Sequence, residues 1–223
     1  MKKVIFGIFA HPDDESFGPA GTLLKLRQEG YDLHFVVLTD GEAGVNPDAA
    51  PNFGETRLGE WQAAVRILGA KTAHALHFPD GSLETISRIQ LENAVEKVIT
   101  NVFDTYEEPP VATLLTFEPQ GLTGHRDHIT VSEVVSHLAP RFNVRELWYF
   151  CLDKNQASLD ETTYYKPRAR PDDYITTRVD VSGQLSDKYR AIEAHHSQRS
   201  DGASIKALGS ERLSYECFRV ELV

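Results

Sequence analysis

The sequence has little of several features that define whole classes of protein. Cysteine occurs twice in 223 residues, at Cys151 and Cys217, and neither lies in a CxxC pair or beside a histidine. We therefore expect isolated reduced thiols and not a disulfide framework. No apolar stretch approaches the ~20 residues of a membrane-spanning helix, and the apolar run after Met1 is too short for a signal peptide. These absences predict a soluble, cytoplasmic protein with no membrane partner.

Positive charge is also scarce. The chain has 23 lysine and arginine residues against 33 aspartate and glutamate residues, so its net charge is −10. Phosphate contacts need clusters of lysine and arginine, and the charge therefore argues against a nucleic-acid partner. Hydrophobic residues make up 41% of the chain. That is enough for one substantial core, and the length suits a single domain over residues 1–223.

Short apolar runs and amphipathic stretches alternate along the chain. Residues 4–10 and 33–39 are typical of strands buried on both faces of a parallel sheet, and 18–29 between them has helical spacing. Further strands are predicted at 73–78, 111–117, 146–152, 174–181 and 217–222. Further helices are predicted at 56–68, 87–103, 129–138 and 186–196.

This alternation predicts an α/β fold, specifically a Rossmann-like, doubly wound and mostly parallel sheet with helices on both faces. Residues 153–173 depart from it, because they are polar and aromatic and include Pro167 and Pro171. We predict that they form an irregular insertion or lid within the single domain.

A dense polar cluster follows the first predicted strand. His11-Pro12-Asp13-Asp14-Glu15 places one histidine and three carboxylates at the carboxyl end of that strand, where open parallel sheets bind ligands. A divalent metal would compensate these charges, and imidazole with carboxylate suits zinc. Two alternatives stay open for this segment alone. It could be a polar loop that caps a helix, or a magnesium site for phosphoryl transfer, although His11 argues against magnesium.

A second cluster, Gly124-His125-Arg126-Asp127-His128, follows the strand predicted at 111–117 and opens a helix. Two histidines three residues apart share one face of a helical turn, but such pairs are common on surfaces. The two clusters together change the interpretation, since both follow sheet strands at the same edge. They can supply three protein ligands and leave a fourth position open, as in catalytic zinc sites.

The two clusters resemble the LmbE-like, or PIG-L, family of N-acetylglucosaminyl deacetylases. The opening motif of that family, Ala-His-Pro-Asp-Asp-Glu, is intact at residues 10–15, and its Gly-His-x-Asp-His motif is intact at 124–128. Residues 39–44, Leu68-Gly69, 78–81 and Ala-His-His-Ser-Gln at 194–198 also look like family positions in the right order. The resemblance covers residues 3 to about 200.

The resemblance implies a role for each motif residue. His11, Asp14 and His128 would bind one zinc ion per chain. Asp13 would be the general base that takes a proton from the attacking water. His125 would stabilise the oxyanion or protonate the leaving amine. The reaction would be zinc-dependent removal of an acetyl group from an N-acetylated amino sugar or its conjugate, a chemistry that needs a base, an electrophile and an acid.

The resemblance also implies three substrate-binding residues, and each has a plainer alternative. Arg57 could be a solvated surface residue, Asp80 could be a turn residue or could contact a ligand imidazole, and His195 could cap a helix. Glu15 could orient a metal ligand. A non-catalytic metal- or sugar-binding module is a further alternative, against which the intact Asp13 argues. Homo-oligomers occur in the family, but the sequence does not determine the oligomeric state.

Overall fold

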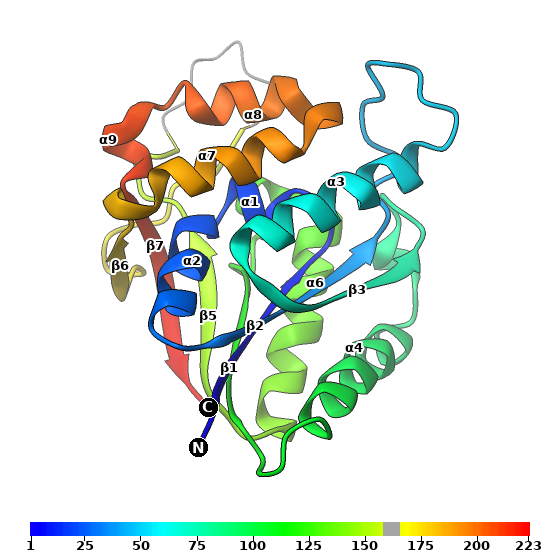
Figure 1. Ribbon diagram of the computed structural model, residues 1–223, viewed down its shortest axis with the longest axis vertical. Coiled ribbons are helices and arrows are strands. Elements are labelled where there is room, and N and C mark those ends of the chain that lie inside the picture. Colours follow the sequence, from blue (N-terminus) through cyan, green and yellow to red (C-terminus); the bar gives the residue numbers. More distant parts are fainter. Residues whose placement is uncertain (158–165) are drawn as a thin grey trace.

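The computed structural model describes residues 1–157 and 166–223, and a twisted sheet runs through its centre (Figure 1). Its seven strands, in the described part of the chain, have the order β3-β2-β1-β4-β5-β7-β6. The strands are β1 (Lys3–Phe9), β2 (Asp32–Thr39), β3 (Ala70–Phe78), β4 (Val111–Phe117), β5 (Val144–Cys151), β6 (Thr177–Asp180) and β7 (Tyr215–Leu222).

The strand directions confirm the predicted fold class. Strands β3, β2, β1, β4 and β5 are all parallel, whereas β7 is antiparallel to both β5 and β6. The three central strands β1, β2 and β4 are almost fully buried and rich in Val, Ile, Leu and Phe, because helices cover both of their faces.

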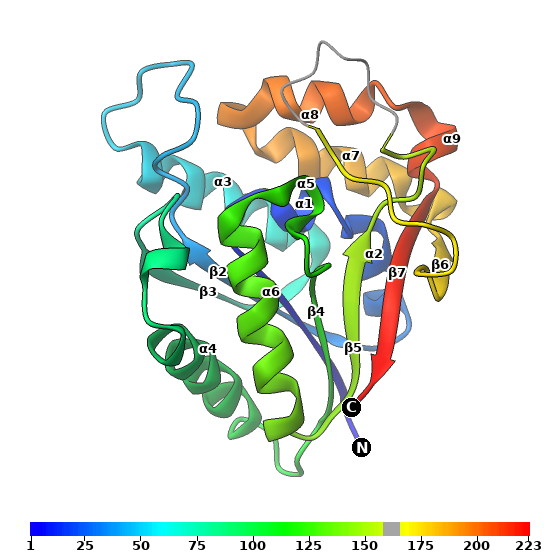
Figure 2. The same cartoon turned by 180° about the vertical axis from the view of Figure 1, so that it is seen from behind.

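The helices lie on both faces of the sheet, as predicted. Helices α4 and α6 cover one face (Figure 2), whereas α2, α3 and α7 pack on the other (Figure 1). The α-helices are α1 (Asp14–Phe17), α2 (Ala20–Gln28), α3 (Phe53–Leu68), α4 (Arg88–Phe103), α5 (Gly121–Gly124), α6 (Arg126–Leu138), α7 (Leu185–Ala194), α8 (Arg199–Lys206) and α9 (Gly209–Leu213). Short 3₁₀ turns cover Leu83–Thr85, Ala139–Arg141, Ser182–Gln184 and His196–Gln198.

Several element boundaries differ from the sequence prediction. Strand β3 begins three residues earlier than predicted, and α6 begins at Arg126 because the His125 side chain caps it. Helices α8 and α9 were not predicted. Both are short and carry few apolar residues, so they lack the periodic pattern that identifies a helix.

The position of β1 determines where a ligand can bind. The chain progresses from β1 through β2 to β3 on one side, and from β4 to β5 on the other, so the strand order reverses between β1 and β4. At such a switch point the loops after the two strands diverge and leave a crevice at their carboxyl ends. The loops that follow β1 and β4 are the two polar clusters of the sequence.

Some expectations stay predictions. The insertion or lid expected at 153–173 includes residues 158–165, which lie outside the described residues. The assignment of one domain over 1–223 is likewise an expectation from length and composition. Within the described residues, every helix is too short or too polar to cross a membrane.

The buried histidine of β2 leads to a prediction about acid stability. His34 lies between the hydroxyls of Thr72 (2.8 Å) and Tyr106 (2.9 Å), and burial, with the charge of Lys71, lowers its pKa to about 4. The unfolded chain therefore binds more protons than the folded chain between pH 4 and ~6.5. This contribution to stability is intact above the unfolded pKa and declines as the pH falls towards 4.

We expect acidification from about pH 7 to pH 4 to lower the free energy of unfolding of the wild type by about 1 to 3 kcal/mol more than that of His34→Gln. Urea titrations at several pH values would measure the difference. His196→Gln, at an exposed histidine, serves as the control. Parallel pH profiles for the wild type and His34→Gln would contradict the assignment.

Candidate metal centre and active site

The two polar clusters meet at the switch point. His11 follows β1, Asp14 begins α1, and His128 lies in the first turn of α6 after β4. His11 Nδ1 lies 3.1 Å from His128 Nε2, and Asp14 Oδ1 lies 3.2 Å from the same His128 nitrogen. Asp14 Oδ2 lies 3.7 Å from His11 Nδ1. Three groups that were predicted to bind one metal therefore converge on a single point.

The outer nitrogen of each imidazole has a partner of its own. His11 Nε2 faces the carboxylates of Asp80 (3.1 Å) and Asp127 (3.3 Å). His128 Nδ1 faces the carbonyl oxygen of Gly121 at 3.2 Å. These acceptors require a proton on the outer nitrogen, so in the neutral rings His11 Nδ1 and His128 Nε2 both carry lone pairs. Two lone pairs 3.1 Å apart repel unless a proton or a metal ion lies between them.

The electrostatics of the site also favour a cation. Burial lowers the pKa of His11, but hydrogen bonds to Asp127 and Asp80 and the charge of Asp14 outweigh it and raise that pKa to about 10. Burial likewise opposes ionisation of Asp14, yet His128 and His11 hold its pKa well below the usual range. The surrounding carboxylates thus stabilise positive charge at this point.

The donor set fits a zinc-sized ion. Ligands about 2.1 Å from a tetrahedral centre lie about 3.4 Å from one another, and the two imidazole nitrogens of His11 and His128 lie 3.1 Å apart. Asp14 approaches the two rings through different oxygens, with Oδ1 at 3.2 Å from His128 Nε2 and Oδ2 at 3.7 Å from His11 Nδ1. The ring nitrogens of His11, His125 and His128 also lie within 4.8 Å of one another. Nitrogen donors favour zinc over magnesium, which prefers oxygen ligands.

Asp13 lies beside this centre and has a different environment from Asp14. Its backbone φ is 129°, a conformation that residues other than glycine rarely adopt and that occurs at functional sites. Its Oδ2 accepts a hydrogen bond of 2.7 Å from Arg57. Burial, opposed by Arg57, raises the pKa of Asp13 to about 6, which is suitable for a general base near neutral pH.

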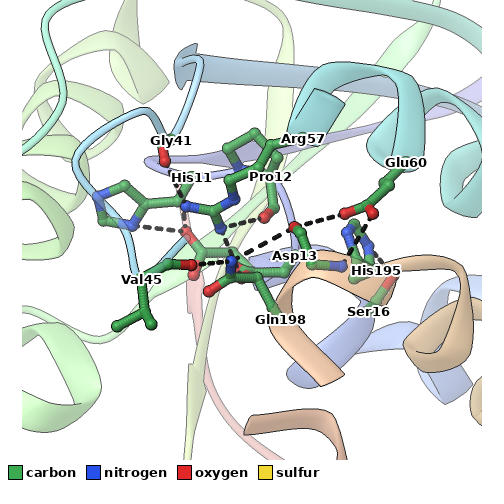
Figure 3. A network of polar contacts seen from close by, with 12 residues as sticks. His11, Pro12, Asp13, Ser16, Gly41, Val45, Arg57, Glu60, His195 and Gln198 are labelled. Atoms are coloured by element: carbon green, nitrogen blue, oxygen red, sulfur yellow. Dashed lines mark hydrogen bonds and ion pairs between the residues drawn. The ribbon is translucent and has the colours of Figure 1, made fainter. Parts of the chain in front are cut away.

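Arg57 of α3 is buried, and its guanidinium contacts the loop that carries Asp13 (Figure 3). One terminal nitrogen donates to Gly41 O at 2.8 Å, and the other donates to Pro12 O and to Asp13, both at 2.7 Å. The side chain lines the cavity of the site. Its strongest contacts nevertheless orient the carboxylate of Asp13, a role that sequence reasoning missed.

The hydrogen bond at the start of α6 determines the tautomer of His125. This residue is the N-cap of the helix, and its Nδ1 accepts a hydrogen bond of 3.2 Å from the backbone N–H of Asp127. Burial, with the nearby His11 and His128, lowers the pKa of His125. The neutral ring therefore carries its proton on Nε2, where it can donate to a negative oxygen or to a leaving amine.

Two carboxylates support His11. Asp80 lies in the cavity wall, contacts the imidazole of His11 and also accepts the backbone N–H of Ala43 at 2.9 Å. Asp127 is fully buried and accepts the backbone N–H groups of Gly81 (2.8 Å) and Leu83 (3.0 Å). Asp127 lies between the two histidines of the second motif, and that position could have indicated from the sequence that it supports the site, but the role was not predicted.

His195 is the one predicted site residue that the structure places away from the cavity. It is buried, and its Nε2 lies 3.0 Å from Glu15 Oε1 and 3.1 Å from the hydroxyl of Ser16 (Figure 3). Glu15 Oε2 in turn accepts the backbone N–H of Asp13 at 3.4 Å. His195 and Glu15 therefore support the Asp13 loop from behind, where they cannot contact a ligand in the cavity.

A cavity of about 320 Å³ opens over this centre. Its polar wall includes the seven other predicted residues, which are His11, Asp13, Asp14, Arg57, Asp80, His125 and His128. Its apolar wall includes Phe17, Phe117, Leu122 and Ile205, and Asp201 also lines it. The volume is at the lower end of the range for small-molecule sites and suits one sugar ring.

The fold and the site together define a class of protein. Imidazole and carboxylate donors with room for a further ligand, a base with a raised pKa and a neutral imidazole donor lie in one cavity at the switch point of an α/β sheet. This combination is typical of a metal-dependent hydrolase.

The chain belongs to the PIG-L family, described as GlcNAc-PI de-N-acetylases, whose model matches residues 6–139. The matched region contains both polar clusters and excludes α7, α8 and α9. The resemblance stated from the motifs is thereby confirmed, and the protein is an N-deacetylase, an enzyme that hydrolyses the amide bond between an acyl group and an amine.

Similar proteins extend this match to most of the chain. Diacetylchitobiose deacetylase of Thermococcus kodakarensis is 31% identical, over 89% of this chain and 70% of its own. The 1D-myo-inositol 2-acetamido-2-deoxy-alpha-D-glucopyranoside deacetylase of Saccharomonospora viridis is 27% identical, over 91% and 88%. The structure of N,N'-diacetylchitobiose deacetylase from Pyrococcus horikoshii shares the fold, with a TM-score of 0.73 at 19% identity over 99% of this chain and 84% of its own.

The contacts of Asp127 lead to a prediction about metal affinity. Asp127→Asn weakens the acceptor that orients His11, and changes of this kind typically reduce metal affinity about 10- to 100-fold. Competition titration with a chromogenic chelator would measure the zinc affinity of the variant and the wild type. Asp187→Asn, at an exposed carboxylate of α7, is the control. An unchanged affinity in Asp127→Asn would show that Asp127 does not support the metal site.

Proposed function

We propose that the protein removes the acetyl group from an N-acetylated amino sugar or its conjugate, with one zinc ion per chain held by His11, Asp14 and His128. The single observation that carries this proposal is the pair of imidazole nitrogens 3.1 Å apart, each with its proton committed to an acceptor on its outer side. That arrangement favours positive charge between the two rings, which a bound metal ion would supply, and it lies in a cavity that also contains a base and a proton donor.

The similar proteins support the class of substrate. Those of T. kodakarensis and S. viridis are named for acetylated glucosamine units linked to a second sugar or to inositol. The cavity of about 320 Å³ has both polar and apolar walls. An amino sugar ring also has a hydroxylated rim and an apolar face, so it matches such walls better than a wholly apolar amide does.

Each residue of the site has a distinct part in amide hydrolysis. A zinc ion, when bound, polarises the amide carbonyl and makes a water molecule more acidic. Asp13, held by Arg57, takes a proton from the attacking water. The Nε2–H of His125 donates to the oxygen that becomes negative, and the amine departs with the proton that Asp13 took from the water.

The two alternatives from the sequence are weaker. Magnesium-dependent phosphoryl transfer would use Asp13 and Asp14 together, but they face different partners, Arg57 in one case and His128 in the other. The site also offers two imidazoles, which magnesium disfavours. A non-catalytic binding module would need neither the raised pKa of Asp13 nor a neutral His125 that caps α6.

A cytoplasmic location is part of the proposal. Cys151 and Cys217 are buried and unpaired on neighbouring strands, which suits a reducing compartment.

The general base can be tested by one substitution. Asp13→Asn removes the proton acceptor but keeps the shape of the side chain, and we expect kcat to fall about 10²- to 10⁴-fold. Amine release from N-acetylglucosamine and a panel of its conjugates would measure the rate, and metal analysis would check that zinc is retained. Asp104→Asn, at the exposed end of α4, is the control. Undiminished hydrolysis of every active substrate by Asp13→Asn would refute the mechanism.

The metal can be tested independently. We expect chelation to abolish amide hydrolysis, Zn²⁺ to restore it, and His128→Ala to lose both metal and activity because a nitrogen ligand is removed. Magnesium-dependent activity that survives His128→Ala would instead support the phosphoryl-transfer alternative.

A further inference from the structure

Helix α8 forms one wall of the cavity over the metal centre. Asp201 and Ile205 of this helix line the cavity. They are four residues apart, so they lie on the same face of the helix. Helix α8 lies beyond residues 6–139, the part that matches the family model. The residues of α8 in the cavity wall can therefore give this chain a substrate specificity that the family match does not define.

Close packing holds α8 in position. A Cβ atom at Gly202 would lie 3.0 Å from Cγ2 of Ile192 in α7, so the absence of a side chain there lets the two helices pack closely. At its start, Arg199 forms two contacts of 2.7 Å with Asp48, and Gln198 donates to Val45 O at 3.0 Å. In Figure 1, α8 lies alongside α7 at the carboxyl end of the sheet. The position of Asp201 in the wall is thus determined by the packing of the helix.

The carboxylate of Asp201 differs from the other acids of the cavity. Asp13, Asp14 and Asp80 each have a hydrogen-bond or ion-pair partner at 3.2 Å or less. The Asp201 side chain is partly buried, and over residues 1–157 and 166–223 no donor forms a hydrogen bond or ion pair with it. Its oxygens remain available to a ligand.

The surroundings of Asp201 indicate from which kind of donor its carboxylate accepts a hydrogen bond. Ile205 and Phe17 line the same cavity, so the wall offers an apolar surface with a carboxylate beside it. A pyranose ring presents apolar C–H groups on its face and hydroxyl donors at its rim. An N-acetylated amino sugar is neutral, and its donors are the acetamide N–H, which every acetamide substrate shares, and the ring hydroxyls, which only the sugar provides.

We propose that Asp201 is a specificity-determining residue that accepts a hydrogen bond from a ring hydroxyl of the amino sugar. The inference rests on the proposed deacetylase function and adds to it. Asp201 would favour hydroxylated acetamides over apolar ones, because an apolar substrate would bury the carboxylate without providing a donor.

The test removes the Asp201 carboxylate and individual substrate hydroxyls, separately and together, and compares the losses of activity. The zinc-loaded wild type, Asp201→Ala and Asp201→Asn are each assayed on N-acetylglucosamine, on its 3-, 4- and 6-deoxy analogues, and on N-acetylcyclohexylamine. We expect one deoxy analogue to lose about 10- to 100-fold in kcat/KM with the wild type. Asp201→Ala should show a similar loss on the parent sugar and little further loss on that analogue. Asp201→Asn, which keeps an acceptor oxygen, should lose less.

Controls separate this inference from folding and from the proposed function. Glu211→Gln, at an exposed acid of α9, should behave as the wild type, and zinc content and melting temperature report on folding. Equal losses by Asp201→Ala on all substrates, including N-acetylcyclohexylamine, would overturn the inference, as would no loss at all. In either case the proposed function survives, since the wild type still cleaves acetamides. A wild type that cleaves neither these acetamides nor any conjugate of N-acetylglucosamine would overturn both.

Discussion

The approach of His11 to His128 is the contact on which the rest of the site depends. Two imidazole nitrogens lie 3.1 Å apart. In the neutral rings neither of them carries a proton, because the proton of each ring lies on the other nitrogen, which donates to a carboxylate or to a carbonyl oxygen. Such a contact is stable only with positive charge beside it. The adjacent parallel strands β1 and β4 bring these two side chains together from positions 117 residues apart.

The adjacent carboxylates Asp13 and Asp14 have different pKa values because they contact different partners. Asp14 faces two imidazoles, and its pKa is held well below the usual range. Asp13, one residue earlier, turns towards a single guanidinium, and burial raises its pKa to about 6. Because the φ of Asp13 is positive, its side chain and that of Asp14 point in different directions. In the proposed mechanism, one dipeptide thus supplies both a metal ligand, which must stay ionised, and a base, which must exchange a proton near neutral pH.

Much of the fold was predictable because parallel strands buried on both faces are continuous apolar runs. Strand β4 was predicted at its exact bounds, and β1 and β2 within about a residue. The short helices α8 and α9 were not, because they have few apolar residues and are stabilised by contacts with distant parts of the chain. Element boundaries such as the start of α6 depended on a cap formed by a side chain, His125.

The sequence by itself determined the chemistry of the site: two motifs after two buried strands, with imidazoles and carboxylates that suit zinc. The tertiary structure decided which atom of each residue faces which partner. It placed Arg57 against Asp13, put Asp127 behind His11, and removed His195 from the cavity. It also brought Asp201 into the cavity wall. The physical reason is that motifs identify donor types, whereas proton positions and pKa values depend on neighbours that are distant in sequence.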